Sequence, residues 1–215
     1  MFFLIFEALL LPTLAMSQES SPGFHEHDGF YLSLSTGVGG ASYHSTVSGC
    51  CTGKATGGAG IFDLKVGGSI IRDQMILSGD WIGIRMQNPK YTYNASGVYE
   101  PTVLDNEDMT LLGLGITHYF TFSNVFLNGT FGAGQFIQGS GHITTLNDST
   151  YYFGNVKSDY GFGFQVKCGK EWWVSKDWGL GISAFLFHLD VSDKAFPNTI
   201  RNGSSFGILF NSTFN

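Results

Sequence analysis

The chain has 215 residues, which is enough for one domain with a substantial core or for one β-barrel. Only 13% of the residues are charged, about half the share in soluble domains, whereas glycine (30) and phenylalanine (20) are abundant, so a disordered chain is excluded. The net charge of −6 argues against a nucleic-acid partner, because phosphate binding needs a basic surface.

The chain begins with an apolar block, MFFLIFEALLLPTLAMSQ, that only Glu7 interrupts. The block is shorter than the roughly 20 apolar residues of a membrane-spanning helix, and the small residues Ala15 and Ser17 suit a cleavage site. Although no Lys or Arg precedes the block, we expect residues 1–17 to be a signal peptide and 18–28 a polar leader. No composition break divides residues 29–215, which we expect to form one domain.

Segments that alternate between apolar and polar residues follow the leader, as is typical of β-strands. In the first of them, Phe30, Leu32 and Leu34 oppose Tyr31 and Ser33. The eight segments cover roughly 29–40, 60–71, 75–86, 109–121, 125–137, the stretch from Gly161 to a turn at Ser175–Asp177, 178–189 and 204–215.

The third segment is the least regular. Ile82, Ile84 and Met86 form its apolar side, but Asp80 and Trp81 do not follow the same alternation. We therefore predict that these three apolar side chains face outward and that a β-bulge lies near Asp80.

The connections between the segments alternate between short and long. The short ones lie near Arg72–Asp73, Ser123–Asn124 and Ser175–Asp177, and the long ones cover roughly 41–59, 87–108, 138–158 and 190–203. Eight strands joined in this way predict an all-β fold, an eight-stranded antiparallel up-and-down β-barrel. Eight is also the smallest strand number usual for membrane barrels.

Residue size and charge decide which face of the predicted barrel is wet. A soluble binding barrel would carry many Lys and Glu outside, and these are missing. One face of the strands is Phe, Leu, Ile and Val, which would aggregate in water, and the other is mostly Gly, Ser, Thr and Asn, which can fill a narrow lumen. The pattern therefore predicts a transmembrane barrel with its apolar face toward lipid.

A few charged and amide side chains fall on the predicted lumen face. We expect them to form a ladder of ion pairs that fills the interior, because an unpaired buried charge is costly. The alternative is that they gate a narrow path for water. The candidates are Asp63, Lys65, Arg85, Gln165, Lys167 and Glu171.

Aromatic residues gather at the end of the barrel that carries the short turns. Amphipathic rings favour the headgroup zone of a bilayer and form girdles there. By convention this rim is periplasmic, so both termini would be periplasmic too. The predicted girdle consists of Tyr119, Phe120, Trp172, Trp173, Trp178 and Phe214.

Two further clusters have chemistry that we weigh against a plain structural reading. The stretch from His25 to Asp28 could ligate a metal, but we favour a solvated polar leader and expect no metal or cofactor. Cys50 and Cys51 could form a vicinal disulfide or a metal site, and we favour a plain pair in a loop. Cys168 follows the lipid-facing alternation and reads as a small apolar residue.

Three stretches carry a resemblance to a known family: HDGFYLSLSTGVGG (27–40), GKEWWVSKDWGLGI (169–182) and the end SFGILFNSTFN. They resemble the small outer-membrane β-barrel proteins of Gram-negative bacteria, the OmpA/OmpW-like class. The resemblance implies an outer-membrane location and recognition of the C-terminal strand by the barrel-insertion machinery. Such barrels usually end in an aromatic residue, whereas here Asn215 follows Phe214.

The resemblance implies no single activity, since members include anchors, adhesins, conduits and lipid enzymes. Lipid A deacylases of this architecture use a Ser, a His and an acid on the outer wall. His118 and His188 fall on the lipid-facing alternation, but the His-x-Ser arrangement of those enzymes is absent, so we expect no enzyme. The expected function is a membrane-anchored structural or interaction protein whose long loops can bind an extracellular ligand. The alternative is a narrow conduit for small or hydrophobic molecules.

Overall fold

The structure, a computed structural model, describes residue 27 and residues 29–95, 98–120, 123–144, 150–193 and 199–215. The predicted signal peptide, 1–17, and all of the predicted leader except His27 lie outside these residues. None of the described residues forms a helix long and apolar enough to cross a membrane.

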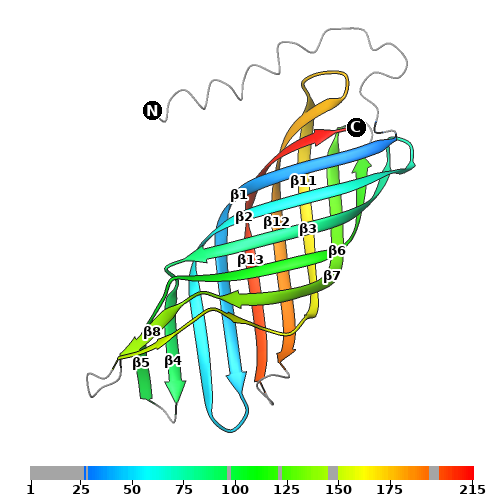
Figure 1. Cartoon of the computed structure of the whole chain (residues 1–215). Helices are drawn as coiled ribbons and strands as arrows, with labels where there is room; N and C mark the ends of the chain where they lie inside the picture. Colours follow the sequence, from blue (N-terminus) through cyan, green and yellow to red (C-terminus); the bar gives the residue numbers. More distant parts are fainter. Residues whose placement is uncertain (1–26, 28, 96–97, 121–122, 145–149, 194–198) are drawn as a thin grey trace, which may run out of the picture.

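Eight long strands of the described chain form a closed wall (Figure 1). Each pairs antiparallel with its neighbours, and β1 closes the ring because it pairs with both β2 and β13. The predicted eight-stranded antiparallel up-and-down barrel is therefore confirmed. In order around the wall, the strands are β1 (Phe30–Val47), β2 (Cys51–Ile71), β3 (Met75–Gln87), β6 (Asn106–Phe120), β7 (Val125–Gln138), β11 (Gly161–Trp173), β12 (Trp178–Asp193) and β13 (Thr199–Phe214).

Five short strands extend the sheet past one end of the barrel (Figure 1). β4 pairs with the first residues of β2, from Cys51 to Thr56. β5 pairs with both β4 and β8, β9 pairs with β8, and β10 pairs with β7. We call this the hairpin end and the opposite one the turn end. The strands are β4 (Lys90–Ala95), β5 (Val98–Leu104), β8 (Gly141–Thr144), β9 (Thr150–Phe153) and β10 (Val156–Lys157).

The prediction of long loops was wrong for most of their length. Where a loop was expected over 41–59, β1 and β2 stay paired as far as Val47 opposite Cys51. Strands also occupy most of 87–108 and part of 138–158. Small polar residues were read as loop, but outside a bilayer a ladder can carry them on both faces, since its backbone hydrogen bonds alone hold the strands together.

The turn end carries tight turns at the predicted places. Asp73 and Asn124 have φ of 60° and 48°, in the left-handed region that Asp and Asn tolerate better than most side chains. Each turn lets the next strand begin at once, at Met75 and at Val125. The local chemistry of these residues therefore sets the up-and-down topology.

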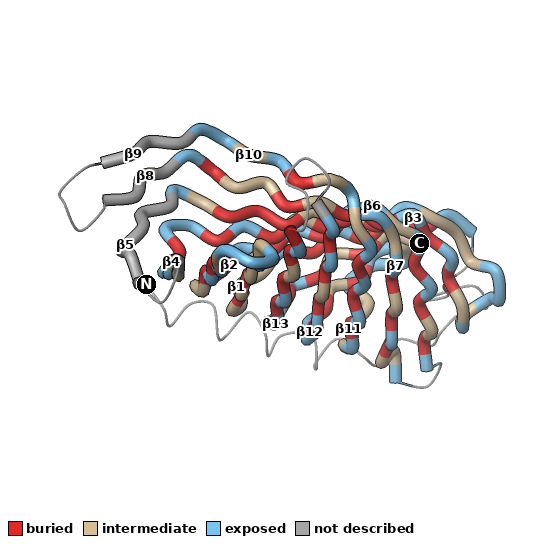
Figure 2. Tube along the Cα trace, turned by 90° about the horizontal axis from the view of Figure 1, so that it is seen from below, coloured by how far each residue is buried: buried red, intermediate tan, exposed pale blue. Residues whose placement is uncertain are grey.

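Side chains alternate between the interior and the outer surface along the wall (Figure 2). Phe62, Phe164 and Ile208 point outward, with exposed fractions of 38%, 38% and 61%, and Lys167 points inward with 2%. The predicted orientation of the wall is confirmed. The outward apolar side chains form what we call the outer apolar band, over 30–38, 62–71, 77–81, 112–120, 127–131, 162–168, 178–186 and 206–214.

The predicted orientation of Ile82, Ile84 and Met86 on β3 was wrong. Their side chains are buried in the interior, because the alternation runs without interruption through β3. The irregularity lies instead on β2, where the pairing with β3 shifts between Ser69 and Ile71.

The interior consists of two layers with different chemistry. Its turn-end layer is mostly polar and charged. The layer nearer the hairpin end is an apolar core, which gives β3 and β12 apolar side chains on their inner faces. This core contains Ala41, Tyr43, Ala55, Ala59, Ile61, Ile82, Ile84, Met86, Met109, Leu111, Phe136, Phe185, Phe187, Leu189, Val191 and Leu209.

The outer apolar band can be tested at Leu114, an outward side chain of β6. Leu114→Arg should lower the free energy of unfolding by about 2–4 kcal/mol, because a charge near the middle of a bilayer is costly. The measurement is urea unfolding of protein refolded into lipid vesicles. Leu114→Ala is the control and should cost less. An unchanged unfolding free energy for the Arg variant would mean that this face meets water.

Candidate functional site

Lys65 is the centre of the polar layer in the lumen. Its ammonium Nζ lies 2.6 Å from Asp80 Oδ2 and 3.4 Å from Asp63 Oδ1, and it donates to Thr130 Oγ1 at 3.2 Å. Asp80 also accepts hydrogen bonds from the hydroxyls of Thr130 and Ser78. These groups are almost fully buried, so the lysine charge is balanced by two carboxylates rather than by water.

A second lysine completes this network from the other side of the barrel. Lys167 on β11 donates to Asp63 Oδ2 at 3.0 Å and to Ser35 Oγ at 3.2 Å, and it lies over the ring of Phe126. Asp63 therefore bridges two lysines. Since the partners come from β1, β2 and β11, the network ties opposite parts of the wall together.

Most of the predicted lumen residues lie where the alternation placed them. Asp63, Lys65, Gln165, Lys167 and Glu171 are buried in the interior.

Arg85 is the exception, and its predicted place was wrong. It points outward from β3, and its side chain is 61% exposed. Asp80, the main partner of Lys65, was missed because we expected a bulge there; its alternation with Leu77, Gly79 and Trp81 was the available signal.

Aromatic and acidic side chains fill the mouth of the lumen at the turn end. Glu171 accepts hydrogen bonds from the Tyr119 hydroxyl at 3.1 Å and from Thr213 Oγ1 at 2.8 Å. His27 stacks on the Tyr119 ring, with 3.7 Å between the centroids, and its backbone N–H donates to Asp73. His27 is thus buried rather than solvated as the leader prediction had it, and burial lowers the pKa of its imidazole.

The predicted girdle divides into two groups. Tyr119 and Trp173 do not belong to it, since Tyr119 is buried in the mouth and the Trp173 ring lies 4.8 Å from that of His27. Four of the predicted residues lie on the outer face, where the rings of Trp178 and Phe214 meet at 5.3 Å. These four are Phe120, Trp172, Trp178 and Phe214. Their contact with lipid headgroups remains a proposal.

Glu107 lies in the interior toward the hairpin end, opposite Met86 of the apolar core. Its carboxyl is fully buried, and burial raises its pKa to about 8. The positive charge of Arg201 on β13 opposes this shift, and the nearby Asp108 adds to it. Burial likewise raises the pKa of Tyr43, which faces the same carboxyl. This site was not predicted, because a loop was expected over 87–108.

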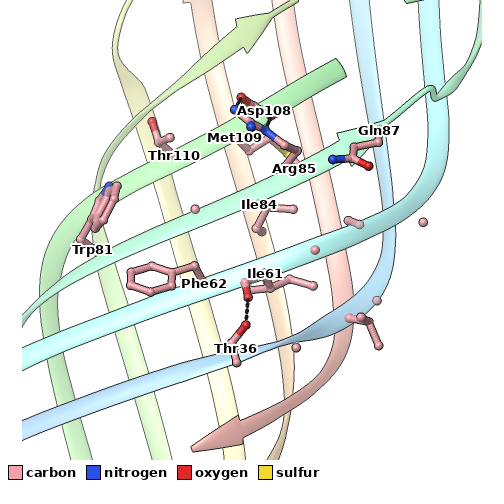
Figure 3. Close-up of a pocket in the computed structure, with 17 residues that line it drawn as sticks. Thr36, Ile61, Phe62, Trp81, Ile84, Arg85, Gln87, Asp108, Met109 and Thr110 are labelled. Carbon is pink, nitrogen blue, oxygen red and sulfur yellow. Dashed lines mark hydrogen bonds and ion pairs between the residues drawn. The ribbon is translucent and has the colours of Figure 1, made fainter. Parts of the chain in front are cut away.

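A groove runs along the outer wall across β1, β2, β3 and β6, with a volume of about 750 Å³ (Figure 3). Its floor contains glycines, and Phe62 and Trp81 meet edge to face at 5.5 Å beside it. Arg85 lines the groove with Asp108, to which it donates two hydrogen bonds, from Nε at 2.8 Å and from Nη2 at 2.6 Å. An ion pair so exposed contributes only about 0–1 kcal/mol to stability.

The cysteines separate as follows. Cys50 and Cys51, favoured above as a plain pair, are joined by a disulfide at the tip of the β1–β2 hairpin. Cys168 is free and exposed on the outer face. No three His, Cys, Asp or Glu side chains within the described chain lie together as a metal site would require. Of the stretch from His25 to Asp28, weighed above as a metal site, only His27 lies within the described residues.

The charge network can be tested by removing its central cation. Lys65→Met should lower the free energy of unfolding by about 3–5 kcal/mol, because it leaves Asp80 buried without a counter-charge. Lys65→Met combined with Asp80→Asn removes both charges and should recover a large part of this loss. The measurement is urea unfolding in vesicles. Equal stability of the single and double variants would contradict the pairing.

The raised pKa of Glu107 predicts a pH dependence of stability. The folded protein holds this proton more tightly than the unfolded chain, whose value is near 4.5. The stabilisation is therefore complete below about pH 4.5 and is lost as the pH rises through about 8. Glu107→Gln should flatten the decline in urea midpoint between pH 5 and pH 9.

Asp105→Asn is the matched control for this variant. Asp105 is an exposed acid two residues away that accepts a hydrogen bond from Ser140. Its replacement should leave the decline unchanged. If Glu107→Gln keeps the wild-type pH dependence, the buried carboxyl is not its source.

Comparisons with known proteins agree with this architecture. No protein-family model matches the chain, and no curated protein matches it. Among solved structures, the outer membrane protein OprG from Pseudomonas aeruginosa matches with a TM-score of 0.50 and 10% identity over 88% of this chain and 98% of that one. Neisserial surface protein A matches with a TM-score of 0.42 and 13% identity over 89% of this chain and 98% of that one.

The outer membrane protease OmpT from Escherichia coli also matches, with a TM-score of 0.45 and 10% identity over 93% of this chain and 99% of that one. At such identities a likeness indicates the fold and not the activity. The chain therefore resembles small outer-membrane barrels in its strand pattern and in its closed eight-stranded wall.

Proposed function

We propose that the chain is an outer-membrane protein whose barrel anchors a surface sheet with a structural or binding role. The observation that carries this proposal is the filled lumen. The polar network fills the lumen toward the turn end, and the apolar core together with the buried Glu107 fills it toward the hairpin end. A barrel whose lumen is filled in this way suits a rigid anchor better than a pore.

The proposed orientation places the turn end in the periplasm. The C-terminal strand β13 ends there, and its outward Phe206, Phe210 and Phe214 are the type of signal that barrel-insertion machinery reads. Export by the predicted signal peptide, 1–17, belongs to the same proposal. Lipid would cover the outer apolar band, with Arg85 at the headgroup level of the opposite leaflet.

The hairpin end is the proposed binding surface. There the β1–β2 hairpin continues for several residues past the outer apolar band, and β4, β5, β8 and β9 widen the sheet on one side of it (Figure 1). The Cys50–Cys51 disulfide lies at the tip of the hairpin. Within the described chain, an extracellular ligand would meet this sheet first.

Planar-bilayer recording distinguishes the anchor from the conduit. We expect the refolded mature chain to give no steady single-channel current, because buried side chains fill the lumen. The double variant Phe136→Ala with Leu111→Ala, which empties part of the apolar core, is the comparison. Steady current steps from the unmodified chain would favour the alternative function, a narrow conduit for small molecules.

The orientation can be tested with an epitope tag in living Gram-negative cells. A tag inserted between Ser48 and Gly49 should bind antibody on intact cells, since it lies at the tip of the β1–β2 hairpin. A tag between Ser175 and Lys176, at the turn end, should bind only after the outer membrane is opened. Equal access to both tags, or access reversed, would contradict the proposed anchoring.

A further inference from the structure

Three polar side chains form a hydrogen-bonded chain on the outer wall. His188 Nδ1 lies 2.8 Å from Ser204 Oγ, and His188 Nε2 lies 2.9 Å from Asp190 Oδ2. β12 supplies His188 and Asp190, two residues apart and hence on one face. β13 supplies Ser204, which lies directly opposite His188 in the register of the two strands.

This order of groups suits nucleophilic catalysis. When the His188 Nε2–H donates its hydrogen bond to the Asp190 carboxylate, the imidazole is held in the tautomer whose Nδ1 lone pair faces the Ser204 hydroxyl. An imidazole placed in this way can take the hydroxyl proton as the oxygen attacks a carbonyl carbon. His188 is 35% exposed and Asp190 60%, so the site is open to a substrate from outside.

The surroundings indicate a lipid rather than a soluble substrate. Leu186 and Phe206 belong to the outer apolar band and lie two residues from His188 and Ser204 toward the turn end. They border a groove of about 610 Å³ whose lining is apolar. Small residues at Ala184 and Gly207 open this groove, which continues along the lipid-facing wall.

An acyl chain that lies in this groove therefore brings its carboxyl end toward Ser204. The junction of acyl chain and headgroup is also where the ester bonds of membrane lipids occur. The ring of Phe164 lies 5.8 Å from that of His188 and shields one side of the imidazole. Asn202 lies two residues from Ser204 on the same face, where its side-chain amide can donate to a developing oxyanion.

We propose that Ser204, His188 and Asp190 form a hydrolytic site that cleaves carboxylic esters of acyl lipids in the outer leaflet. Ser204 Oγ attacks the ester carbonyl while its proton passes to His188 Nδ1. The bond from the carbonyl carbon to the ester oxygen breaks, and the leaving alcohol takes that proton. Water then attacks the acyl-serine with His188 again as base, which releases the fatty acid and restores the Ser204 hydroxyl.

The expectation of no enzyme rested on the absence of a His-x-Ser arrangement, which would place the serine on the same strand as the histidine. In the structure the serine comes from the neighbouring strand, 16 residues later in the chain. Asp190 was already visible beside His188 in the sequence, but nothing there indicated that Ser204 lies opposite. This activity goes beyond the proposed anchor and surface sheet, and neither depends on the other.

The test uses the full mature chain refolded into two kinds of vesicle. One kind contains phosphatidylethanolamine and phosphatidylglycerol, and the other contains lipid A. Free fatty acid is measured by mass spectrometry. Release from either kind supports the site and identifies the source of the ester. No release from either kind, above that of Ser204→Ala, would overturn the proposal.

The variants separate catalysis from folding. Ser204→Ala should reduce release by about 10³-fold or more, while Ser42→Ala, which replaces the outward serine opposite Ser204 on β1, should leave it unchanged. Asp190 is a positioning residue, so Asp190→Asn should lower the rate of fatty-acid release and also change the pH dependence of that rate. Heat-modifiable migration on gels checks that each variant folds.

Covalent labelling gives a second readout that needs no lipid. A long-chain fluorophosphonate should modify Ser204, and the adduct should be found on its peptide by mass spectrometry. His188→Asn should abolish the adduct while the barrel stays folded. Modification that is equal in the His188→Asn variant, or that occurs at Ser42 instead, would contradict a catalytic role for this histidine.

Discussion

Closure of the backbone hydrogen-bond ring is the constraint on which the rest of the structure depends. In a bilayer no water satisfies an unpaired N–H or C=O, so a sheet can cross only if its two edges meet. Here β1 and β13 make that closure, in register from Leu32 opposite Phe214 to Val47 opposite Thr199. Once the ring is closed, every side chain of the wall points either into the lumen or toward the outer surface.

The side chains that fill the lumen stabilise the fold. An eight-stranded barrel is just wide enough for its side chains, and this chain fills that space with an ion network at one end and an apolar core at the other. A buried charge is tolerable only beside its partner, which explains why Asp63 bridges Lys65 and Lys167. Since the interior is occupied, chemistry with outside molecules is left to the ends and to the outer wall.

Two clusters of hydrogen-bonded polar side chains lie beside grooves on the outer wall of the described chain. One is the pair of Arg85 and Asp108 beside a groove over glycines. The other is the chain of Ser204, His188 and Asp190, which also borders a groove. Both places join an apolar groove to a polar group, a combination that matches the amphipathic shape of a lipid.

The sequence by itself determined the eight strands of the wall, their order and the face of most of them, but not the five short strands at the hairpin end. Alternation with period two is a local property, and Asp73 and Asn124 encode the tight turns without help from distant residues. The sequence also placed Asp63, Lys65 and Lys167 in the lumen, because size and charge distinguish the two faces within one strand.

Only the tertiary structure decided which face of β3 points inward and which side chains meet across strands. Alternation is relative, so the inward face of Ile82 and the outward face of Arg85 follow from what fills the lumen at that height. Tyr119 shares the inward face of Thr117 by alternation, and the tertiary structure adds its hydrogen bond to Glu171 in the mouth. Partners such as Lys65 with Asp80 depend on register between strands, which is a property of the closed sheet and not of any one segment.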